Sequence, residues 1–460
     1  SMALVVSADN MMTFMLCWES MSLSSFFLVI YNYEVAANRK AGYLYFVFSQ
    51  VGALFILAAF ALIYSQGGGF GFTTAAALPD GLKMGVFILA FVGFGSKAGV
   101  FPFHVWLPHA HPAASSHISA VMSGVMIKTG IYGILRMYDI LNWHTPVFGY
   151  IVLVAGMFSG ILGVVYALGQ HDIKRLLAYH SVENIGIILI GIGIGMIGVA
   201  AGKPIMAVLG FAGGLLHVLN HAIFKSLLFM GAGMVLHKTG TGSIDLLGGL
   251  IKRMKITGTT FLIGSLAISG LPPFNGFVSE FLIYLGGFRG VALGRVDFAA
   301  AILAIISLAI IGGLALACFT KVVGVVFQGE PRSEHAVNVD ENGPSMLIPM
   351  LILAAACITI GVFPSAFMMM AVKGNSALKL GYGQLPLEPF MPLTANITRV
   401  AALFLTTFMV ILTLRALFYR GKIITRSGTW GCGFTQPTVK MQYTGSSYAA
   451  SILEFFSPVA

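Results

Sequence analysis

Long, nearly continuous apolar runs dominate the sequence, and short segments rich in glycine, proline and charge separate them. Eleven of these runs are long enough to cross a hydrocarbon layer of about 30 Å as helices. They lie near residues 10–33, 42–65, 81–101, 113–136, 147–169, 176–200, 205–235, 257–287, 298–325, 346–371 and 397–418. Breakers of regular structure such as Gly67-Gly68-Gly69 and Lys203-Pro204 fall between them. The pattern predicts an all-α, polytopic bundle of transmembrane helices.

Composition points to the same class of protein. The chain of 460 residues is 57% hydrophobic and 9% charged, with a mean hydropathy of +0.90. A soluble domain is about 45–50% apolar and about 25% charged. A soluble fold of this length cannot hide so much apolar surface from water. The apolar runs also lack the ten-residue alternation typical of membrane β-barrels, so we expect transmembrane helices.

The basic residues are unevenly distributed between the two sets of loops. Of the 26 Lys and Arg residues, we assign fifteen to one set of span ends and eight to the other, and three lie inside spans. The positive-inside rule places the richer set, together with the C-terminal tail, in the cytoplasm. The formal charge of +10 therefore reflects membrane topology, and we expect no nucleic-acid partner. The lipid bilayer is the expected surroundings.

Six charged residues are predicted to lie inside spans, where an ionised side chain costs several kcal/mol. They are Glu19, Lys97, Lys128, Glu183, Lys225 and Glu280. One interpretation is a set of static ion pairs that join helices, although desolvation makes buried pairs poor stabilisers. The other is a relay for protons, in which each carboxylate tunes a neighbouring lysine. One such residue in each of six spans favours the relay.

Two predicted spans are interrupted by proline. The third runs into residues 101–108 (FPFHVWLP) and the eighth into residues 269–276 (SGLPPFNG). Broken helices beside ionisable groups are typical of transporters. The breaks lie five spans apart, as do Glu19 and Glu183, and an odd period implies two units of opposite topology. We therefore predict inverted five-helix repeats at about 1–140 and 147–327 within a translocating domain at 1–330. Residues 331–460 would hold the C-terminal membrane helices and tail.

Histidines add to the candidate relay. His217, His221 and Lys225 recur at intervals of four residues and share one stripe of a helix. Histidine titrates near neutral pH, which suits proton transfer. A heme or metal pair and an ordinary polar helix contact are the alternatives for this stripe. Four further histidines crowd the junction of the third and fourth spans, and we expect some of them to cap the broken helix: His104, His109, His111 and His117.

Redox chemistry is not expected in this chain. The four cysteines, Cys17, Cys318, Cys357 and Cys432, are isolated in the sequence, with no CxxC pair and no zinc-type spacing. A dinucleotide-binding glycine fingerprint after a strand and a phosphate-binding loop are also missing. We therefore expect no cofactor, no metal and no catalytic redox site here.

Several motifs resemble the antiporter-like family of complex I and Mrp. Residues 94–99 (FGSKAG) with 102–108 (PFHVWLP) resemble its broken-helix motif, and residues 172–181 (DIKRLLAYHS) resemble its cytoplasmic turn. Residues 221–229 (HAIFKSLLF) resemble its central lysine helix, and Trp18-Glu19 its glutamate helix. The likeness covers roughly residues 11–330. It implies that Glu19 and Lys97 form a modulating pair, that Lys128 and Lys225 continue a central axis, and that Glu280 ends the relay.

Within this family the chain looks most like the large antiporter-like subunit of group 4 nickel–iron hydrogenases, a branch that includes formate hydrogenlyase and hydrogenase 4. Residues 181–186 (SVENIG), 430–433 (WGCG) and 441–443 (MQY) carry this likeness. In complex I relatives the position of Glu183 is often uncharged, and that of Glu280 is a lysine in some subunits. The family has about four more helices before Glu19 and often a lateral helix after the tail, so we expect a truncated chain.

The resemblance implies a membrane subunit that moves protons or sodium ions, in a bacterial or archaeal cytoplasmic membrane. Its partners would be other membrane subunits, the hydrogenase large and small subunits and iron–sulfur proteins, which would carry the nickel–iron and iron–sulfur centres. The chain would thus be a non-redox part of a hydrogenase or an NADH dehydrogenase-like complex. Two alternatives remain: a stand-alone Mrp-type cation/proton antiporter subunit, and a structural membrane anchor with inactive buried charges.

Overall fold

The regular elements of the protein are helices, as the apolar pattern predicts. The computed structural model describes residues 1–457 except 293, 342, 378–390, 423–437 and 439–440. In this part, the only strand-like pairs are the isolated bridges Asn10–Gly71 and Asp172–Ser243. The helices are α1 Met2–Ser7, α2 Met11–Val29, α3 Ala36–Gly67, α4 Asp80–Ala98, α5 Leu107–Ala113, α6 Ser116–Val121, α7 Ile127–Leu141, α8 Pro146–Leu168, α9 Ile173–Ala200, α10 Pro204–Thr239, α11 Lys255–Ile268, α12 Asn275–Gly290, α13 Arg295–Val322, α14 Pro344–Val362, α15 Ser365–Ala377, α16 Met391–Tyr419 and α17 Gly445–Phe455.

The expected spans are confirmed, and their subdivision follows from proline and glycine. Among the described residues, ten helical segments are long and apolar enough to cross a membrane. One of them, Ser116–Leu141, joins α6 and α7 through a π-helical turn at Met122–Met126. The eighth predicted span is divided into α11 and α12, and the tenth into α14 and α15 around Pro364. A residue before proline avoids helical geometry, which explains the second division.

Both predicted helix breaks are present. Helix α4 ends at Ala98, where Gly99 adopts φ +80, and the chain becomes helical again only at Leu107. Helix α11 ends at Ile268, and α12 begins at Asn275. Gly270 lies in this second break with φ +65, and a Cβ atom there would come within 2.5 Å of the Glu280 carboxylate. Glycine is therefore required at this position both by the backbone and by the approach of Glu280.

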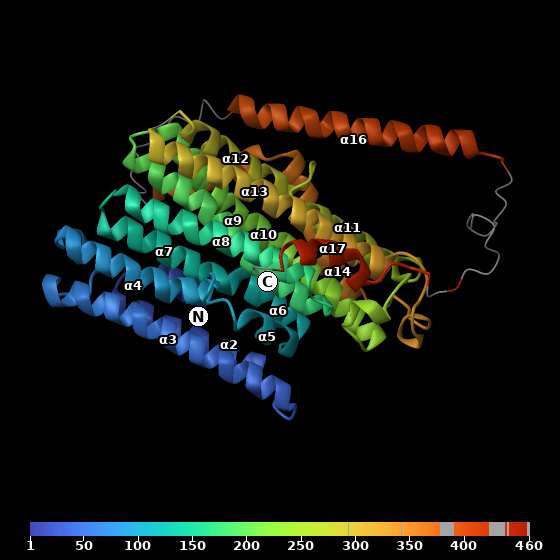
Figure 1. Ribbon diagram of the computed structural model, residues 1–460, viewed down its shortest axis with the longest axis horizontal. Coiled ribbons are helices and arrows are strands. Elements are labelled where there is room, and N and C mark those ends of the chain that lie inside the picture. The colour runs from blue at the N-terminus through green and yellow to red at the C-terminus, as the bar shows by residue number, and fades with distance from the viewer. Residues whose placement is uncertain (293, 342, 378–390, 423–437, 439–440, 458–460) are drawn as a thin grey trace.

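Helix α9 forms the centre of the bundle, between α8 and α10 (Figure 1). Its side chains are almost all buried, and glycines let the neighbouring helices approach closely. A Cβ on Gly186 would lie 2.3 Å from the backbone nitrogen of Gly160 on α8. Small residues at such contacts are how membrane helices pack tightly. Helices α2, α3 and α4 occupy one edge of the bundle, and α16 lies at the opposite edge with most of its side chains exposed.

The span ends that carry the larger share of Lys and Arg, among them Lys174, Lys238, Lys252 and Lys321, are called the basic rim. Two buried lysines of this rim cap helix ends. Lys321 on α13 donates to the carbonyl oxygens of Leu168 (2.6 Å) and Gln170 (3.0 Å), where α8 ends. Lys174 on α9 donates to Pro112 O (3.4 Å) and to Ala114 O, where α5 ends. The last carbonyls of a helix have no partner within the helix, and a cation satisfies them well. These lysines therefore have a structural explanation.

We expect Lys321→Met to destabilise the protein without affecting ion movement directly. The change would leave two carbonyls without their charged donor, a loss of about 1.5–3 kcal/mol. The thermal unfolding midpoint of the detergent-solubilised protein should fall, while Lys255→Met, at an exposed position on α11, should leave it unchanged. An identical midpoint for Lys321→Met and wild type would contradict the capping role.

Candidate ion-translocation site

Lys128 is positioned by the π-helical turn that precedes α7. The ammonium of Lys128 donates to the carbonyl oxygen of Ser123, which lies in this turn. Lys128 Nζ also lies 2.7 Å from His221 Nδ1 on α10. The Ser123 hydroxyl lies 2.7 Å from that of Ser181 on α9. The turn thus joins α7, α9 and α10 through polar contacts.

The stripe of α10 predicted from sequence is wholly buried. His217, His221 and Lys225 each have no solvent exposure. Lys225 Nζ makes no hydrogen bond to any described residue, and it lies 5.8 Å from the centroid of the Phe229 ring. His221 Nε2 is likewise without a partner in the described structure. Burying such groups unpaired is costly, so the stripe is poorly suited to a purely structural role.

Glu183 on α9 belongs to a second set of contacts that reaches the same stripe. Its carboxylate pairs with His180 Nδ1, one helical turn earlier, and accepts a hydrogen bond from Asn184 Nδ2 at 3.4 Å. Asn184 Oδ1 lies 3.1 Å from His217 Nε2. His217 Nδ1 in turn lies 2.9 Å from the Ser279 hydroxyl on α12. These contacts form a continuous polar row from α9 through α10 to α12.

The row ends beside the second helix break. Ser279 accepts from Asn220 Nδ2 at 2.9 Å, and Asn220 also donates to the Asn275 carbonyl at 2.7 Å, at the start of α12. Glu280 follows Ser279 directly, and its carboxylate lies against Gly270 in the break. The break therefore brings a carboxylate and an irregular backbone to the same place, next to the end of the polar row.

Glu19 and Lys97 make no hydrogen bond to the polar row, and no ion pair joins these two residues. Lys97 Nζ donates to Tyr45 OH (2.8 Å), Ser22 Oγ (3.0 Å) and Ser49 Oγ (3.3 Å). Glu19 is half-buried on α2 and accepts from Gln50 Nε2 at 2.9 Å. The two residues are linked through consecutive residues of α3, so their modulating pair stays a prediction.

Static ion pairing does not account for the buried charges. Of the six charged residues predicted inside spans, only Glu183 takes part in an ion pair among the described residues, with His180. Lys97, Lys128 and Lys225 have no carboxylate within ion-pairing distance in the same part of the chain. An ion-pair glue would need such partners.

Sequence reasoning missed four members of the polar row: His180, Asn184, Asn220 and Ser279. The resemblance implies a cytoplasmic turn at residues 172–181, whereas in the structure Asp172 caps α9 and residues 173–181 form its first turns. The three-residue spacing of His180 and Glu183 was the available signal, because it places both on one helix face. Asparagines inside apolar spans were a second signal.

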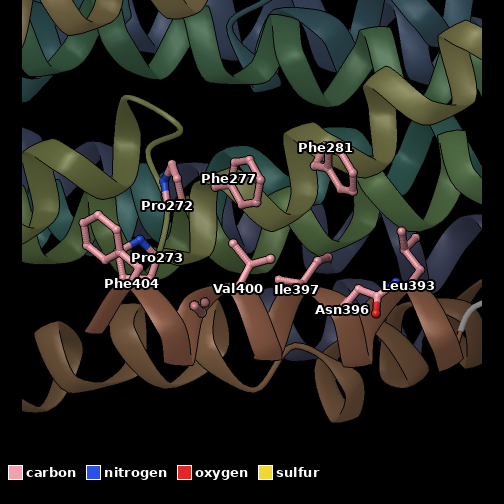
Figure 2. Close-up of a pocket in the computed structure, with 11 residues that line it drawn as sticks. Pro272, Pro273, Phe277, Phe281, Leu393, Asn396, Ile397, Val400 and Phe404 are labelled. Atoms are coloured by element: carbon pink, nitrogen blue, oxygen red, sulfur yellow. The ribbon is translucent and has the colours of Figure 1, made fainter. Parts of the chain in front are cut away.

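An apolar cavity beside the second break has a different character. It holds about 350 Å³ and lies between Pro272 and Pro273, the Phe277 and Phe281 rings of α12, and one face of α16 (Figure 2). Its lining is almost wholly apolar, and the six buried charged residues do not contribute to it. Such a cavity offers no polar path for an ion, so we do not include it in the site.

No three His, Cys, Asp or Glu side chains converge as metal ligands within the described residues. Cys432 and the WGCG segment lie outside those residues. The polar row contains titratable side chains, Glu183, His180 and His217, held by asparagine and serine inside a bundle with two broken helices. Fold and site together define a polytopic membrane protein of the antiporter-like class.

Comparison with known proteins identifies the family. Residues 8–307 match the model of the membrane domain described as "NADH:quinone oxidoreductase/Mrp antiporter, TM", and the chain belongs to this family. It is 45% identical to hydrogenase-4 component B of Escherichia coli over 374 residues, which are 79% of this chain and 55% of the relative. It is 35% identical to formate hydrogenlyase subunit 3 of E. coli over 462 residues, 99% of this chain and 73% of the relative.

A solved structure shares the fold. The Mrp complex from Dietzia sp. DQ12-45-1b contains a chain that matches with a TM-score of 0.69 and 22% identity, covering 82% of this chain and 76% of that one. The resemblance noted from the motifs is thereby confirmed at the level of family and fold.

Proposed function

We propose that this chain is the proton-translocating membrane subunit of a membrane-bound hydrogenase, formate hydrogenlyase or related complex I-like complex. The observation that carries this proposal is the buried polar row from Glu183 through His217 to Ser279, next to Glu280, together with the unpaired Lys225. Proton transfer needs titratable groups joined by hydrogen bonds, and this row supplies them across three helices. Lysine and histidine carry protons but do not ligate sodium as oxygen groups do, which favours the proton.

The role of each residue follows from its position. Lys225 would hold the transferred proton at the centre, with His221 and Lys128 on one side and Glu183 and His217 on the other. Glu280 would release the proton beside the broken helix, and Lys97 with Glu19 would respond to events at the α2–α4 edge. The inverted repeats at about 1–140 and 147–327 are part of the proposal, because they would place the two broken helices in equivalent positions.

The partners and location are proposed from the relatives. Names such as hydrogenase-4 component B and formate hydrogenlyase subunit 3 support assembly with a nickel–iron hydrogenase, iron–sulfur proteins and other membrane subunits in the cytoplasmic membrane. Redox cofactors would reside in those partners. The basic rim and the C-terminal tail would face the cytoplasm, as the positive-inside rule requires.

Purification through a tag on this chain tests the assembly. We expect a nickel–iron large subunit and iron–sulfur proteins to co-purify. The family also includes Mrp antiporter domains, which keeps the Mrp-type alternative under test. Sodium-dependent proton exchange without any hydrogenase component would favour that alternative and contradict the proposal.

Glu19→Gln is expected to impair ion movement because it removes one negative charge and little else. The amide oxygen of glutamine can still accept the hydrogen bond from Gln50. If the charge of Glu19 contributes about 1.4 kcal/mol to a protonation step of the relay, its loss changes the equilibrium constant of that step roughly tenfold. We therefore expect coupled proton movement to decrease about tenfold. Glu19→Asp, which keeps the charge, should lose less. Wild-type proton movement in vesicles carrying Glu19→Gln would show a static role.

A further inference from the structure

His111 is a buried histidine that the polar row does not use. It lies on the short helix α5, within the segment that follows the first break, and has no solvent exposure. Neither ring nitrogen makes a hydrogen bond to any described residue. The imidazole stacks on Phe229 with ring centroids 4.7 Å apart, and Lys225 Nζ lies 5.8 Å from the centroid of the same Phe229 ring. Phe229 is thus a shared neighbour of His111 and Lys225.

The surroundings of His111 do not fit a structural histidine. The backbone there is already fixed, because Ser119 Oγ donates to the His111 carbonyl at 2.9 Å and Lys174 caps the end of α5. A buried histidine with a packing role usually has at least one ring nitrogen bonded, since an unpaired polar group costs about 1–3 kcal/mol. His111 is therefore not one of the histidines whose side chain caps the broken helix.

A cavity, here called the vestibule, lies at the start of α6, directly after the segment that carries His111. This cavity of about 570 Å³ lies between the start of α6, the last turns of α10 and the start of α14. Its lining includes Ser115, Ser116, His117 and His237, which offer hydrogen bonds to water, and Met230. Gly233 also lines the vestibule, and it lies one helical turn after Phe229 on the same face of α10. The vestibule therefore reaches the face of α10 on which His111 stacks. The charged groups that act on the His111 ring are Lys174, Lys225 and Lys128.

We propose that His111 passes protons between this vestibule and Lys225. The inference rests on the proposed relay and adds its connection to the basic rim. A neutral imidazole would accept a proton from vestibule water at one ring nitrogen and release the proton of the other nitrogen, through water, to the neutral amine of Lys225. The ring remains neutral as the other tautomer, and rotation about its Cβ–Cγ bond restores the starting state. Two unpaired ring nitrogens are what this step needs.

The test uses the intact complex, purified through a tag on this chain and reconstituted into liposomes that report internal pH with a dye. His111→Phe keeps a flat ring on Phe229 but cannot carry a proton, and we expect it to slow coupled proton movement about 10²-fold, as for other positioned proton-transfer groups. The control is His109→Phe, two residues away on the same helix at an exposed position, which should move protons at the wild-type rate.

Two further variants separate a proton carrier from a packing residue. His111→Ala, which leaves room for a free ring, should be slow and should recover when imidazole is added. If His111→Phe does not assemble, His111→Gln replaces it and is judged by the same criterion. The inference is overturned if assembled His111→Phe, or His111→Gln in its place, moves protons at the wild-type rate. It is also overturned if His111→Ala is slow and imidazole does not restore its proton movement. If the His111 variants move protons normally but Lys225→Met is inactive, only the role of His111 is refuted and the proposed function survives. If Lys225→Met also moves protons normally, the role of His111 and the proposed function are both refuted.

Discussion

Replacing Lys225 with Met is expected to abolish coupled proton movement and to leave the complex assembled. The Lys225 ammonium makes no hydrogen bond and no ion pair to the described residues, so its removal breaks no such contact. Met is close in length and is neutral, and it avoids the cost of burying an ammonium. The unfolding midpoint should therefore stay the same or rise. Proton movement should fall by about 10²-fold or more, the usual contribution of a positioned proton-transfer group.

The matched control for Lys225→Met lies on the same helix. Lys238 in the last turn of α10 pairs with Asp340 at 3.3 Å near the surface, and such pairs contribute about 0–1 kcal/mol. Lys238→Met should therefore affect neither stability nor proton movement. The comparison needs co-purification of partners, thermal unfolding and dye-reported proton movement from the same preparations. A Lys225→Met variant that unfolds early but pumps normally in its surviving fraction would assign Lys225 to the structure instead.

Glu280→Gln should decrease proton movement much more than it decreases stability. Glutamine has nearly the same shape and can occupy the space against Gly270, but it cannot accept and release a proton. We expect a decrease of about 10²-fold. No described residue forms an ion pair with Glu280, so neutralising it leaves no buried cation unpaired. The thermal unfolding midpoint should stay the same or rise slightly, because a buried charge has been removed.

A static role for Glu280 predicts the opposite result. If the carboxylate held a buried cation, Glu280→Gln would cost about 3–5 kcal/mol, and the surviving complex would pump normally. Glu334→Gln, an exposed acid near the basic rim, serves as the control. Thermal unfolding of the detergent-solubilised complex, measured beside proton uptake in vesicles, distinguishes the two outcomes.

The fold could be predicted from sequence because its determinants are local. Apolar runs of about twenty residues predict spans, and the prolines at 102, 108, 272 and 273 mark both breaks. The stripe of His217, His221 and Lys225 follows from helical spacing alone. The π-helical turn at Met122–Met126, which aims Lys128 at His221, has no comparable pattern, because it depends on how α6 and the turn itself pack against α10.

The partners of the buried charges could not be predicted in the same way. Which side chains meet depends on helix rotation and rotamers, and these are set by glycine contacts such as that of Gly186 with Gly160. The resemblance implies that Glu19 and Lys97 form a modulating pair, which stays a prediction, but it does not indicate the three hydroxyl partners that Lys97 has in the structure. His111 was missed as a candidate because a histidine beside a helix break is equally compatible with capping.

The most direct test of the account is proton movement by the purified complex in sodium-free liposomes. Electron transfer by the co-purified subunits and internal pH would be recorded together, with and without an uncoupler. The account predicts a pH change that accompanies electron transfer, collapses with the uncoupler and is absent in Lys225→Met. Electron transfer without a pH change in the wild-type complex, or an undiminished pH change in Lys225→Met, would contradict it.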